Sequence, residues 1–298
     1  TLLGPRDISL LAPLVVDAGK KLKDERSVQG LASKLGLAGL SYHPGYTLRI
    51  SSLGNLRVWR GQEEIGGREW QREKALELFL LLLMNRGKYL PKETLYDLLW
   101  PEEDEDTAAR NFKVSLNALR KALEPDRKAQ EDSYYVLRNR SNYGFNSDAG
   151  YVFDVEEFER LLAQGDREKD KKRQNEYYHA AIKLYQGDFL ADVLYVDWVQ
   201  NERERLKSAF LNTLDKLVRY YYLIDDNEQA LQLADLLLEH DSCWEPAYLL
   251  KMKIHHRLNR PFVAIKVYEQ CQTVLERELG VTPMPEIEKY YQELIAEM

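Results

Sequence analysis

The C-terminal half of the chain repeats a short helical pattern at a fixed spacing. Residues 225–234 (DDNEQALQLA) align with residues 259–268 (NRPFVAIKVY) at an offset of 34 residues, which pairs Ala230 with Ala264. This is the period of tetratricopeptide-like helical hairpins, in which a small residue lets two helices approach and apolar residues bury between neighbouring hairpins. We therefore expect a helical-hairpin array over residues 148–298. The amphipathic stretches that predict its helices are 154–164, 173–186, 195–223, 226–239, 244–258, 261–279 and 285–297.

Residues 46–147 carry a different order of patterns. Apolar and polar residues alternate on both sides of Gly54-Asn55, which predicts strands or a hairpin over 46–61. A second alternating stretch, 134–146, predicts another hairpin. Between them, helical spacing predicts three helices at 72–86, 91–100 and 107–123. This order is that of a winged helix, so we expect a mainly α chain with a small β component. Residues 1–45 have no pattern that assigns them.

The distribution of charge limits where a nucleic acid can bind. The 298 residues have a net charge of −7, which by itself argues against a polyanionic partner. Residues 148–298 hold 19 basic and 29 acidic side chains, whereas residues 46–147 hold 17 and 16. The acids of the middle segment gather at 102–106, so the helix and hairpin that follow are locally basic. DNA binding is therefore expected from the middle segment.

The third predicted helix, 107–123, separates an apolar stripe from a basic face. Helical spacing brings Phe112, Leu116 and Leu119 together on the core side. The opposite face consists of Arg110, Lys113, Asn117, Arg120 and Lys121. In the major groove of DNA, Arg or Lys donates to guanine, Asn bonds adenine, and further cations contact phosphates. An ordinary solvated face is the alternative, but a position third in a helical trio and before a basic hairpin favours DNA.

Two flanking segments extend this prediction. We expect the hairpin residues Arg138, Arg140, Asn142 and Tyr143 at the minor groove or the DNA backbone, with a simple solvated turn as the alternative. The acidic run 102–106 complements the positive N-terminal end of the third helix, for which Asp106 or Thr107 is the expected N-cap.

Motifs in both halves resemble one family of bacterial regulators. LRVWRGQ, the helical stretch EKALELFLLLLMNRGKYLPKETLYDLLWPEEDEDTAARNFKVSLNALRKAL and YYVLRNRSNYGF are similar to the OmpR-type winged helix of SARPs, the antibiotic regulatory proteins and their relatives. FDVEEFERLL, LYQGDFL, DWVQNERERLK and YEQCQTVLERELGVTPMPEIEKYY are similar to the second module of that family, the bacterial transcriptional activator domain. The resemblance covers about residues 46–298. One departure is that residues 139–142 replace the Gly-rich turn that the family's wing often carries.

The resemblance implies a sequence-specific transcriptional activator that binds direct repeats near a promoter and contacts RNA polymerase. Its recognition helix corresponds to residues 107–123 and its wing to 138–143. The loop between the second and third helices faces RNA polymerase in such domains, and its acidic residues here are Glu102, Glu103, Asp104 and Glu105. The resemblance leaves open a homodimer on DNA and an upstream sensor domain to which residues 1–45 would belong.

Other features argue against different classes of protein. No segment has the roughly 20 apolar residues of a membrane-spanning helix, and Cys243 and Cys271 are expected as buried thiols in the cytoplasm. Trp59, Trp100, Trp198 and Trp244 are expected in the core. Neither metal-ligand spacing nor a phosphate-binding loop occurs, so no cofactor and no enzymatic activity are expected. The alternative function is a protein-protein scaffold whose winged helix contacts protein. A winged helix with that role has no need of a basic helix face.

Overall fold

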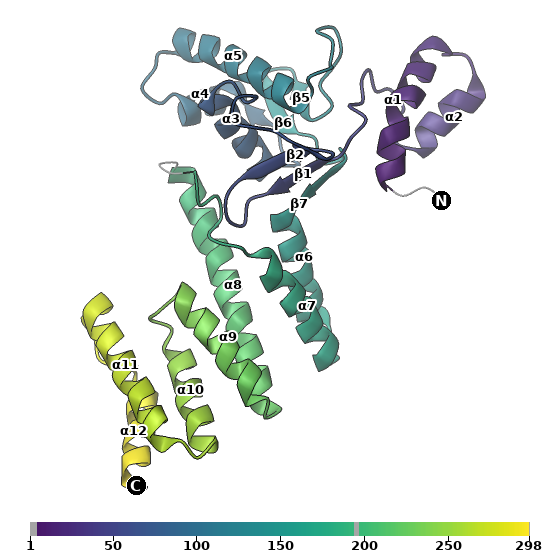
Figure 1. Cartoon of the computed structure of the whole chain (residues 1–298). Coiled ribbons are helices and arrows are strands. Elements are labelled where there is room, and N and C mark those ends of the chain that lie inside the picture. The colour runs from purple at the N-terminus through teal and green to yellow at the C-terminus, as the bar shows by residue number, and fades with distance from the viewer. Residues whose placement is uncertain (1–4, 194–196, 298) are drawn as a thin grey trace. The chain divides into compact units, whose positions relative to one another are not determined.

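The structure is a computed structural model that describes residues 5–193 and 197–297, without the side chains of residues 5–8, 197 and 198 (Figure 1). The expected core position of Trp198 therefore lies outside the described residues. The chain divides into two compact units. Unit 1 is Thr1–Ser51 with Arg57–Phe153, and unit 2 is Ser52–Leu56 with Asp154–Met298.

Unit 1 contains a four-stranded sheet with the strand order β3-β2-β1-β7. β1 (Leu48–Ser51) and β2 (Arg57–Arg60) form the antiparallel hairpin predicted over 46–61, and β3 (Glu63–Glu64) pairs with β2. β7 (Tyr151–Phe153) pairs with β1 in parallel. The sequence pattern does not predict β7, because three residues are too few to establish a period of two.

Three helices and a second sheet follow β3 and form the predicted winged helix. The helices are α3 (Glu73–Met84), α4 (Lys92–Leu99) and α5 (Glu105–Leu123). The strands of the second sheet are β4 (Leu90–Pro91), β6 (Asn142–Phe145) and β5 (Val136–Asn139), in this spatial order. Figure 1 shows the three helices gathered on one side of these strands.

Aromatic residues join α3, α5 and β6 into one core. The ring of Phe79 in α3 lies 5.4 Å from Trp70 and 6.2 Å from Phe145 in β6. Phe112 in α5 lies 5.4 Å from the ring of Tyr96 in α4. These rings are buried, and α5 also packs against α3, so the position of α5 is determined by packing on both neighbouring helices.

Gly144 lets β4 approach β6 closely. A Cβ atom at residue 144 would lie 2.7 Å from the carbonyl oxygen of Lys88, which is closer than real Cβ atoms come to backbone. The pairing of Leu90 with Tyr143 and of Pro91 with Asn142 therefore depends on glycine at this position.

Residues 1–45, which the sequence leaves unassigned, include two helices, α1 (Pro5–Lys21) and α2 (Arg26–Lys34). They share a small core of Ala12, Val16, Ala32 and Leu37. Several contacts connect this part to the rest of unit 1, among them a hydroxyl pair of Ser9 and Thr47 at 3.2 Å and the packing of His43 on Tyr134. Lys20 pairs with Glu131 at 3.0 Å, and the backbone N–H of Asp132 donates to the hydroxyl of Ser41 at 2.9 Å.

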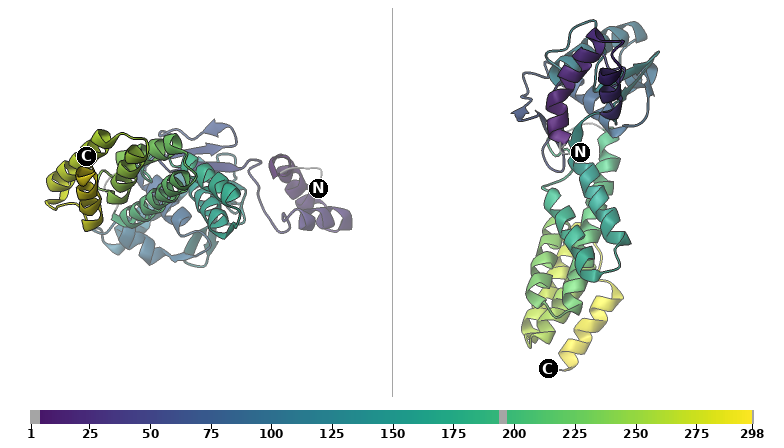
Figure 2. Two further views of the ribbon diagram at one scale, coloured as in Figure 1. Left: turned by 90° about the horizontal axis from the view of Figure 1, so that it is seen from below. Right: turned by 90° about the vertical axis from the view of Figure 1, so that its right-hand side faces the viewer.

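Unit 2 is the predicted helical-hairpin array. Its helices are α6 (Asp154–Arg167), α7 (Lys171–Leu184), α8 (Asp197–Leu223), α9 (Asn227–His240), α10 (Glu245–Arg257), α11 (Pro261–Leu279) and α12 (Pro285–Ala296). Neighbours along the chain pack in pairs, α6 with α7, α8 with α9 and α10 with α11, as Figures 1 and 2 show. Ala230 and Ala264, the small residues of the 34-residue repeat, are completely buried, which confirms their predicted role.

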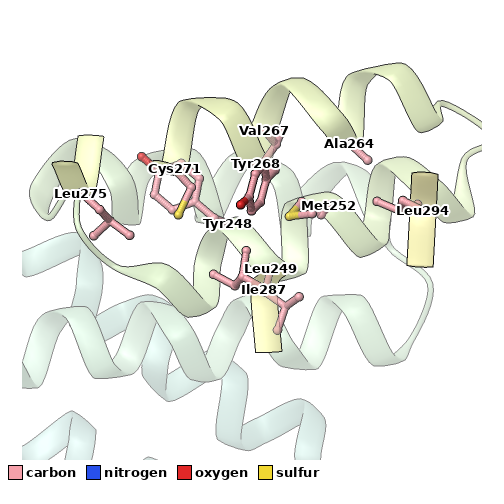
Figure 3. Close-up of a cluster of buried hydrophobic side chains, with 10 residues drawn as sticks. All are labelled: Tyr248, Leu249, Met252, Ala264, Val267, Tyr268, Cys271, Leu275, Ile287 and Leu294. Carbon is pink, nitrogen blue, oxygen red and sulfur yellow. The ribbon is translucent and has the colours of Figure 1, made fainter. Parts of the chain in front are cut away.

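The C-terminal hairpins enclose their own core, shown in Figure 3. Tyr268 of α11 and Tyr291 of α12 stack with ring centroids 3.9 Å apart. Cys271 is completely buried and unpaired, and burial raises the pKa of its thiol to about 12. The expected burial is therefore confirmed for Cys271, whereas Cys243, which packs against this core, and Trp244 are only half-buried.

The loop between β1 and β2 belongs to unit 2 and is held there by Asp154. The Asp154 carboxylate accepts hydrogen bonds from the backbone N–H groups of Ser52 at 2.6 Å and Leu53 at 2.8 Å. The Ser52 hydroxyl donates to the same carboxylate at 2.9 Å. Asp154 is the first residue of α6, so the carboxylate also lies at the positive end of a helix.

Candidate nucleic-acid interface

The exposed side of α5 carries most of the residues that the sequence predicts for DNA contact. Arg110, Lys113, Asn117 and Lys121 are all exposed, and their spacing of three and four residues places them on one side of the helix. The opposite stripe of Phe112, Leu116, Leu119 and Leu123 is buried, as predicted.

A valine lies within this basic surface. Val114 is 42% exposed, and it lies four residues after Arg110, three before Asn117 and seven before Lys121. Sequence reasoning missed Val114 because an apolar residue on a helix is ordinarily assigned to the core. The available signal was its angular distance from the Phe112 stripe. We call Arg110, Lys113, Val114, Asn117 and Lys121 the α5 face.

Arg120 does not belong to the α5 face, contrary to the prediction. Its side chain is only partly exposed, and its Nε is buried without a hydrogen-bond partner among the described residues. Burial, together with the charge of Arg127, lowers the pKa of the Arg120 guanidinium. Arg120 lies about 80° from Phe112 on the helix, at the edge of the core stripe, which explains its partial burial.

The acidic run shapes the beginning of α5. The N-cap is Asp104 and not Asp106 or Thr107 as predicted, because its carboxylate accepts the Thr107 backbone N–H at 3.0 Å. Hydrogen bonds from the Thr107 hydroxyl and backbone lower the pKa of Asp104. Glu103 accepts a hydrogen bond of 2.6 Å from the Asn111 amide. The expectation that these acids complement the helix N-terminus is therefore confirmed for Asp104.

The last carbonyl groups of α5 are also capped by side chains. Arg60 of β2 donates from Nη1 to the carbonyl oxygen of Ala122 at 3.1 Å, and its guanidinium forms an ion pair with Glu69. The Tyr46 hydroxyl donates to the carbonyl oxygen of Leu123 at 2.5 Å. These bonds satisfy carbonyls that a helix end leaves without partners.

The wing is a hairpin with a two-residue turn at Arg140 and Ser141, because Asn139 pairs with Asn142. Arg138 and Arg140 are exposed, whereas Asn142 is half-buried. Arg138 donates from Nε to the carbonyl oxygen of Arg140 at 2.7 Å. Arg140 has a φ of 56°, in the left-handed region that favours glycine.

Tyr143, expected as a DNA-contacting wing residue, is buried. Its ring lies edge-on to Phe112 of α5 with centroids 5.0 Å apart. Tyr143 therefore fixes the wing relative to α5 and, at 8% exposure, presents little surface to a ligand. The Arg138 guanidinium lies 5.8 Å from the centroid of the same ring, which places a cation of the wing close to the helix.

Two tryptophans have different environments. Trp100 is buried, as expected, but Trp59 is half-exposed on the four-stranded sheet. The guanidinium carbons of Arg49 and Arg57 lie 3.9 and 4.8 Å from the centroid of the Trp59 ring. The core prediction for Trp59 is wrong because its side chain points to the face of β2 opposite to that of Val58, which is buried.

Residues 5–193 and 197–297 lack the features of two other classes of site. Within these ranges, histidine, cysteine and acidic side chains form no cluster of the kind that holds a metal ion. No helix in the same ranges is both long and apolar enough to cross a membrane.

Two family models match adjoining parts of the chain. The model described as "Transcriptional regulatory protein, C terminal" matches residues 70–140, and the "Bacterial transcriptional activator domain" matches residues 153–295. The first match contains α3, α4 and α5, and the second contains the helical array. In class, the chain therefore combines the winged-helix module of transcription regulators with a bacterial transcriptional activator domain. The two modules in this order place it in the SARP family of bacterial regulators.

Curated relatives agree with this assignment. The regulatory protein AfsR of Streptomyces griseus is 27% identical over 251 residues, and AfsR of Streptomyces coelicolor is 26% identical over 255 residues. Each alignment covers 83% of this chain and 24% of the relative, so the chain spans about a quarter of the length of AfsR. The regulatory protein DnrI of Streptomyces peucetius is 24% identical over 220 residues, which cover 70% of this chain and 79% of DnrI.

Comparison with a solved structure supports the fold. Mycobacterium tuberculosis EmbR, in complex with a low-affinity phosphopeptide, superimposes with a TM-score of 0.69. The match covers 85% of this chain and 66% of the EmbR chain at 15% sequence identity. At this identity the likeness concerns the fold alone.

Proposed function

We propose that the chain is a sequence-specific transcriptional activator that inserts α5 into the major groove of double-stranded DNA. The observation that carries the proposal is the α5 face, which combines three cations, one amide and one exposed apolar group on a helix whose other side is buried. Such groups match the acceptors, donors and thymine methyl groups along the major groove. A protein-binding scaffold has no need of this combination.

Within the α5 face, position suggests a division of roles. Asn117 and Arg110 lie near the middle of the polar arc of α5 together with Lys113, so they read base edges. Lys121, near the C-terminal end of α5, contacts a phosphate. Val114 contacts a thymine methyl group, because an apolar side chain beside cations gains most from an apolar group in the groove. Arg120, which the sequence assigns to a phosphate, is a weaker candidate because it is partly buried.

The wing supplies the second contact. Arg138 and Arg140 project from the hairpin that Tyr143 ties to α5, and they contact the phosphate backbone or the adjacent minor groove. Asn142 is half-buried and paired in the strand, so its contact is limited to the exposed part of its amide.

The acidic loop is proposed to contact RNA polymerase. Glu102, Glu103, Asp104 and Glu105 are exposed. Next to them is a cavity of about 220 Å³ whose lining includes the carboxylates of Glu93, Asp97, Glu103 and Glu105. A cavity with four acidic side chains suits a lysine or arginine of a partner. The capping bonds of Asp104 do not exclude this role, because its side chain stays at the surface.

The family resemblance supports further parts of the proposal. Direct repeats near a promoter would place two copies of the chain side by side as a homodimer on DNA, in the bacterial cytoplasm. The relatives named AfsR extend well beyond the matched region, which supports a sensor domain in a longer protein.

Selection of binding sites from random duplex DNA tests the proposal directly. We expect one enriched motif, present as a direct repeat. Asn117→Ala or Lys113→Ala should weaken binding to that motif by about 1–3 kcal/mol and relax base preference. Lys121→Ala should weaken binding to all DNA sequences alike. It should also reduce the salt slope, the steepness with which log affinity falls with log salt concentration, by about one. Lys289→Ala, at an exposed lysine of α12, is the matched control. Absence of any enriched motif, or unchanged preference in folded Asn117→Ala and Lys113→Ala proteins, would refute the proposal.

A further inference from the structure

Unit 2 contains a cavity that the proposed DNA contacts do not use. It lies between α6, α7 and the C-terminal part of α8, which run side by side in Figure 1, and has a volume of about 710 Å³. Pockets that bind small molecules in proteins have volumes of roughly 300–1,000 Å³. The size is therefore suited to a small ligand.

One wall of the cavity is built by close packing of α6 on α7. A Cβ atom at Gly165 would lie 2.5 Å from the ring of Tyr178, so only glycine lets this ring sit against α6. Tyr178 is 3% exposed, and its hydroxyl donates to Asp166 at 2.6 Å. Lys216 of α8 donates to the same carboxylate at 2.7 Å. This hydrogen-bonded group gives the cavity a fixed polar end.

Another part of the cavity lining is apolar and exposed. Leu223 is 77% exposed and Ile224 is 52% exposed, and both line the cavity with Tyr220. Two adjacent large apolar side chains in water cost free energy in proportion to the apolar area that they expose. An apolar ligand in the cavity would cover them.

The charge around the cavity is opposite to that of unit 2 as a whole. Residues 154–298 hold 19 basic and 28 acidic side chains, but residues 167–173, at the α6–α7 turn, hold five basic and two acidic ones. Lys171, Lys216 and Arg219 line the cavity, where Lys216 pairs with Asp166 and Arg219 pairs with Asp215. Lys171 forms no ion pair within the described residues, and its Nζ contacts only the Gln174 amide oxygen, at 2.9 Å. An anionic group is therefore the best electrostatic match.

We propose that this cavity binds an amphipathic anion, a small molecule with an apolar body and one carboxylate or phosphate group. The apolar body covers Leu223 and Ile224, and the anionic group lies near Lys171 and Lys216. The proposal concerns unit 2 alone and does not depend on the proposed DNA binding.

Fluorescence titration of the full chain with 8-anilinonaphthalene-1-sulfonate, which has an aromatic body and a sulfonate, tests the site. We expect saturable binding at one site and displacement of the probe by octanoate. Octanol and octylammonium, which share the apolar body but lack the negative charge, should displace it about tenfold less well, because one favourable charge contact adds about 1.4 kcal/mol. Equal displacement by octylammonium would refute the anionic preference, and equal displacement by octanol would refute the need for a charge.

Paired variants locate the site. Leu223→Glu and Lys171→Glu should each lower the affinity for the probe and for octanoate by about tenfold, because both place a negative charge where the anion binds. Leu279→Glu and Lys289→Glu are controls of the same chemistry at exposed positions outside the cavity, and should bind like the unchanged protein. All four positions are exposed, and unchanged melting temperatures verify folding. Unchanged affinity in the two cavity variants, or equal loss in the controls, would overturn the proposal.

Discussion

The hydroxyl of Tyr46 donates a hydrogen bond of 2.5 Å to the carbonyl oxygen of Leu123, 77 residues later in the chain. Leu123 is the last residue of α5, and Tyr46 lies just before β1. The Tyr46 carbonyl in turn accepts from the hydroxyl of the buried Tyr135 at 2.9 Å. Burial raises the pKa of Tyr46 far above its ordinary value, so its hydroxyl remains a donor. The segment that precedes the winged helix thus closes the end of the proposed recognition helix.

Removing this hydroxyl tests its contribution to stability. Tyr46→Phe should lower the free energy of unfolding by about 1 kcal/mol, because the Leu123 carbonyl loses its donor while the ring still packs. Tyr89→Phe is the control, since Tyr89 is exposed and its hydroxyl has no hydrogen bond among the described residues. Denaturant unfolding of both variants measures the difference. Equal stability of the two would show that the bond adds nothing measurable.

His43, in the same segment, should make stability depend on pH. It is 6% exposed, its ring lies 4.4 Å from Tyr134, and its Nδ1 accepts the Gly45 N–H at 3.0 Å. Burial lowers the pKa of His43 from 6.5 to about 4. Between these values the unfolded chain binds a proton that the folded chain does not, so stability is full above pH 6.5 and decreases as the pH falls toward 4. A shift of this size corresponds to about 3 kcal/mol.

The measurement compares the chain with a His43→Phe variant. The variant keeps an aromatic ring beside Tyr134 but cannot titrate. From pH 7 to pH 4, the unchanged chain should therefore lose about 3 kcal/mol more unfolding free energy than the variant. Burial also lowers the pKa of His179 and His255, but these act equally in both proteins. A difference that stays constant with pH would mean that His43 titrates normally.

Gly144 should be intolerant to any side chain. Gly144→Ala places a methyl group against the Lys88 carbonyl oxygen and should cost about 2 kcal/mol or more through displacement of β4 from β6. Gly67→Ala is the control, because a Cβ atom there meets nothing within 4 Å and the backbone has an ordinary φ. Thermal unfolding of both variants distinguishes a steric clash from a general effect of replacing glycine.

The two functions of Arg140 in the wing, charge and turn geometry, can be separated. Arg140→Gly should raise the free energy of unfolding by about 0.5–1 kcal/mol, since glycine adopts the observed φ of 56° without strain. Arg140→Ala keeps the strain and should not stabilise. Both variants lose the cation, so both should bind DNA more weakly with a salt slope lower by about one. Full DNA affinity in both would remove Arg140 from the interface.

Helices were predictable where apolar spacing repeats over several turns. The stripe through Phe112 located α5, and the Ala230 and Ala264 repeat located the array, because a period of 3.6 residues is visible without tertiary contacts. Short strands such as β7 could not be predicted from the sequence, because their pairing depends on a partner about a hundred residues away. α1 was not predicted because Pro13 lies inside it, and proline ordinarily breaks a helix.

The candidate site shows the same limit at the level of single residues. A helical wheel gives the direction in which a side chain points. It does not show whether residues from other parts of the chain cover that side chain. Arg120 is covered by neighbours, with Arg127 among the charges that act on it, and Tyr143 turns inward to meet Phe112. Neither contact follows from local sequence. Val114 shows the reverse case, because its apolar character suggested the core while its angle placed it on the α5 face.

The proposed contact between Val114 and a thymine methyl group yields the sharpest prediction for the proposed interface. In the selected DNA site, replacing that thymidine by deoxyuridine removes only the methyl group and should cost about 0.8 kcal/mol, roughly fourfold in affinity. Val114→Ala should cost a similar amount on the thymidine site, and the two losses should not add, because each removes the same contact. Val114 is exposed, so we expect Val114→Ala to leave the fold and its stability nearly unchanged.

The experiment replaces each thymidine of the site in turn and measures affinity with the unchanged chain, with Val114→Ala and with Val281→Ala. Val281 is exposed to a similar degree, 48%, but lies in unit 2, so its loss and that of the methyl group should be independent. Coupling between Val114 and one thymidine, and its absence for Val281, would place this side chain in the major groove. Additive losses at every thymidine would exclude the methyl contact while leaving DNA binding itself intact, whereas loss of all specific binding in the unchanged chain would contradict the proposed function instead.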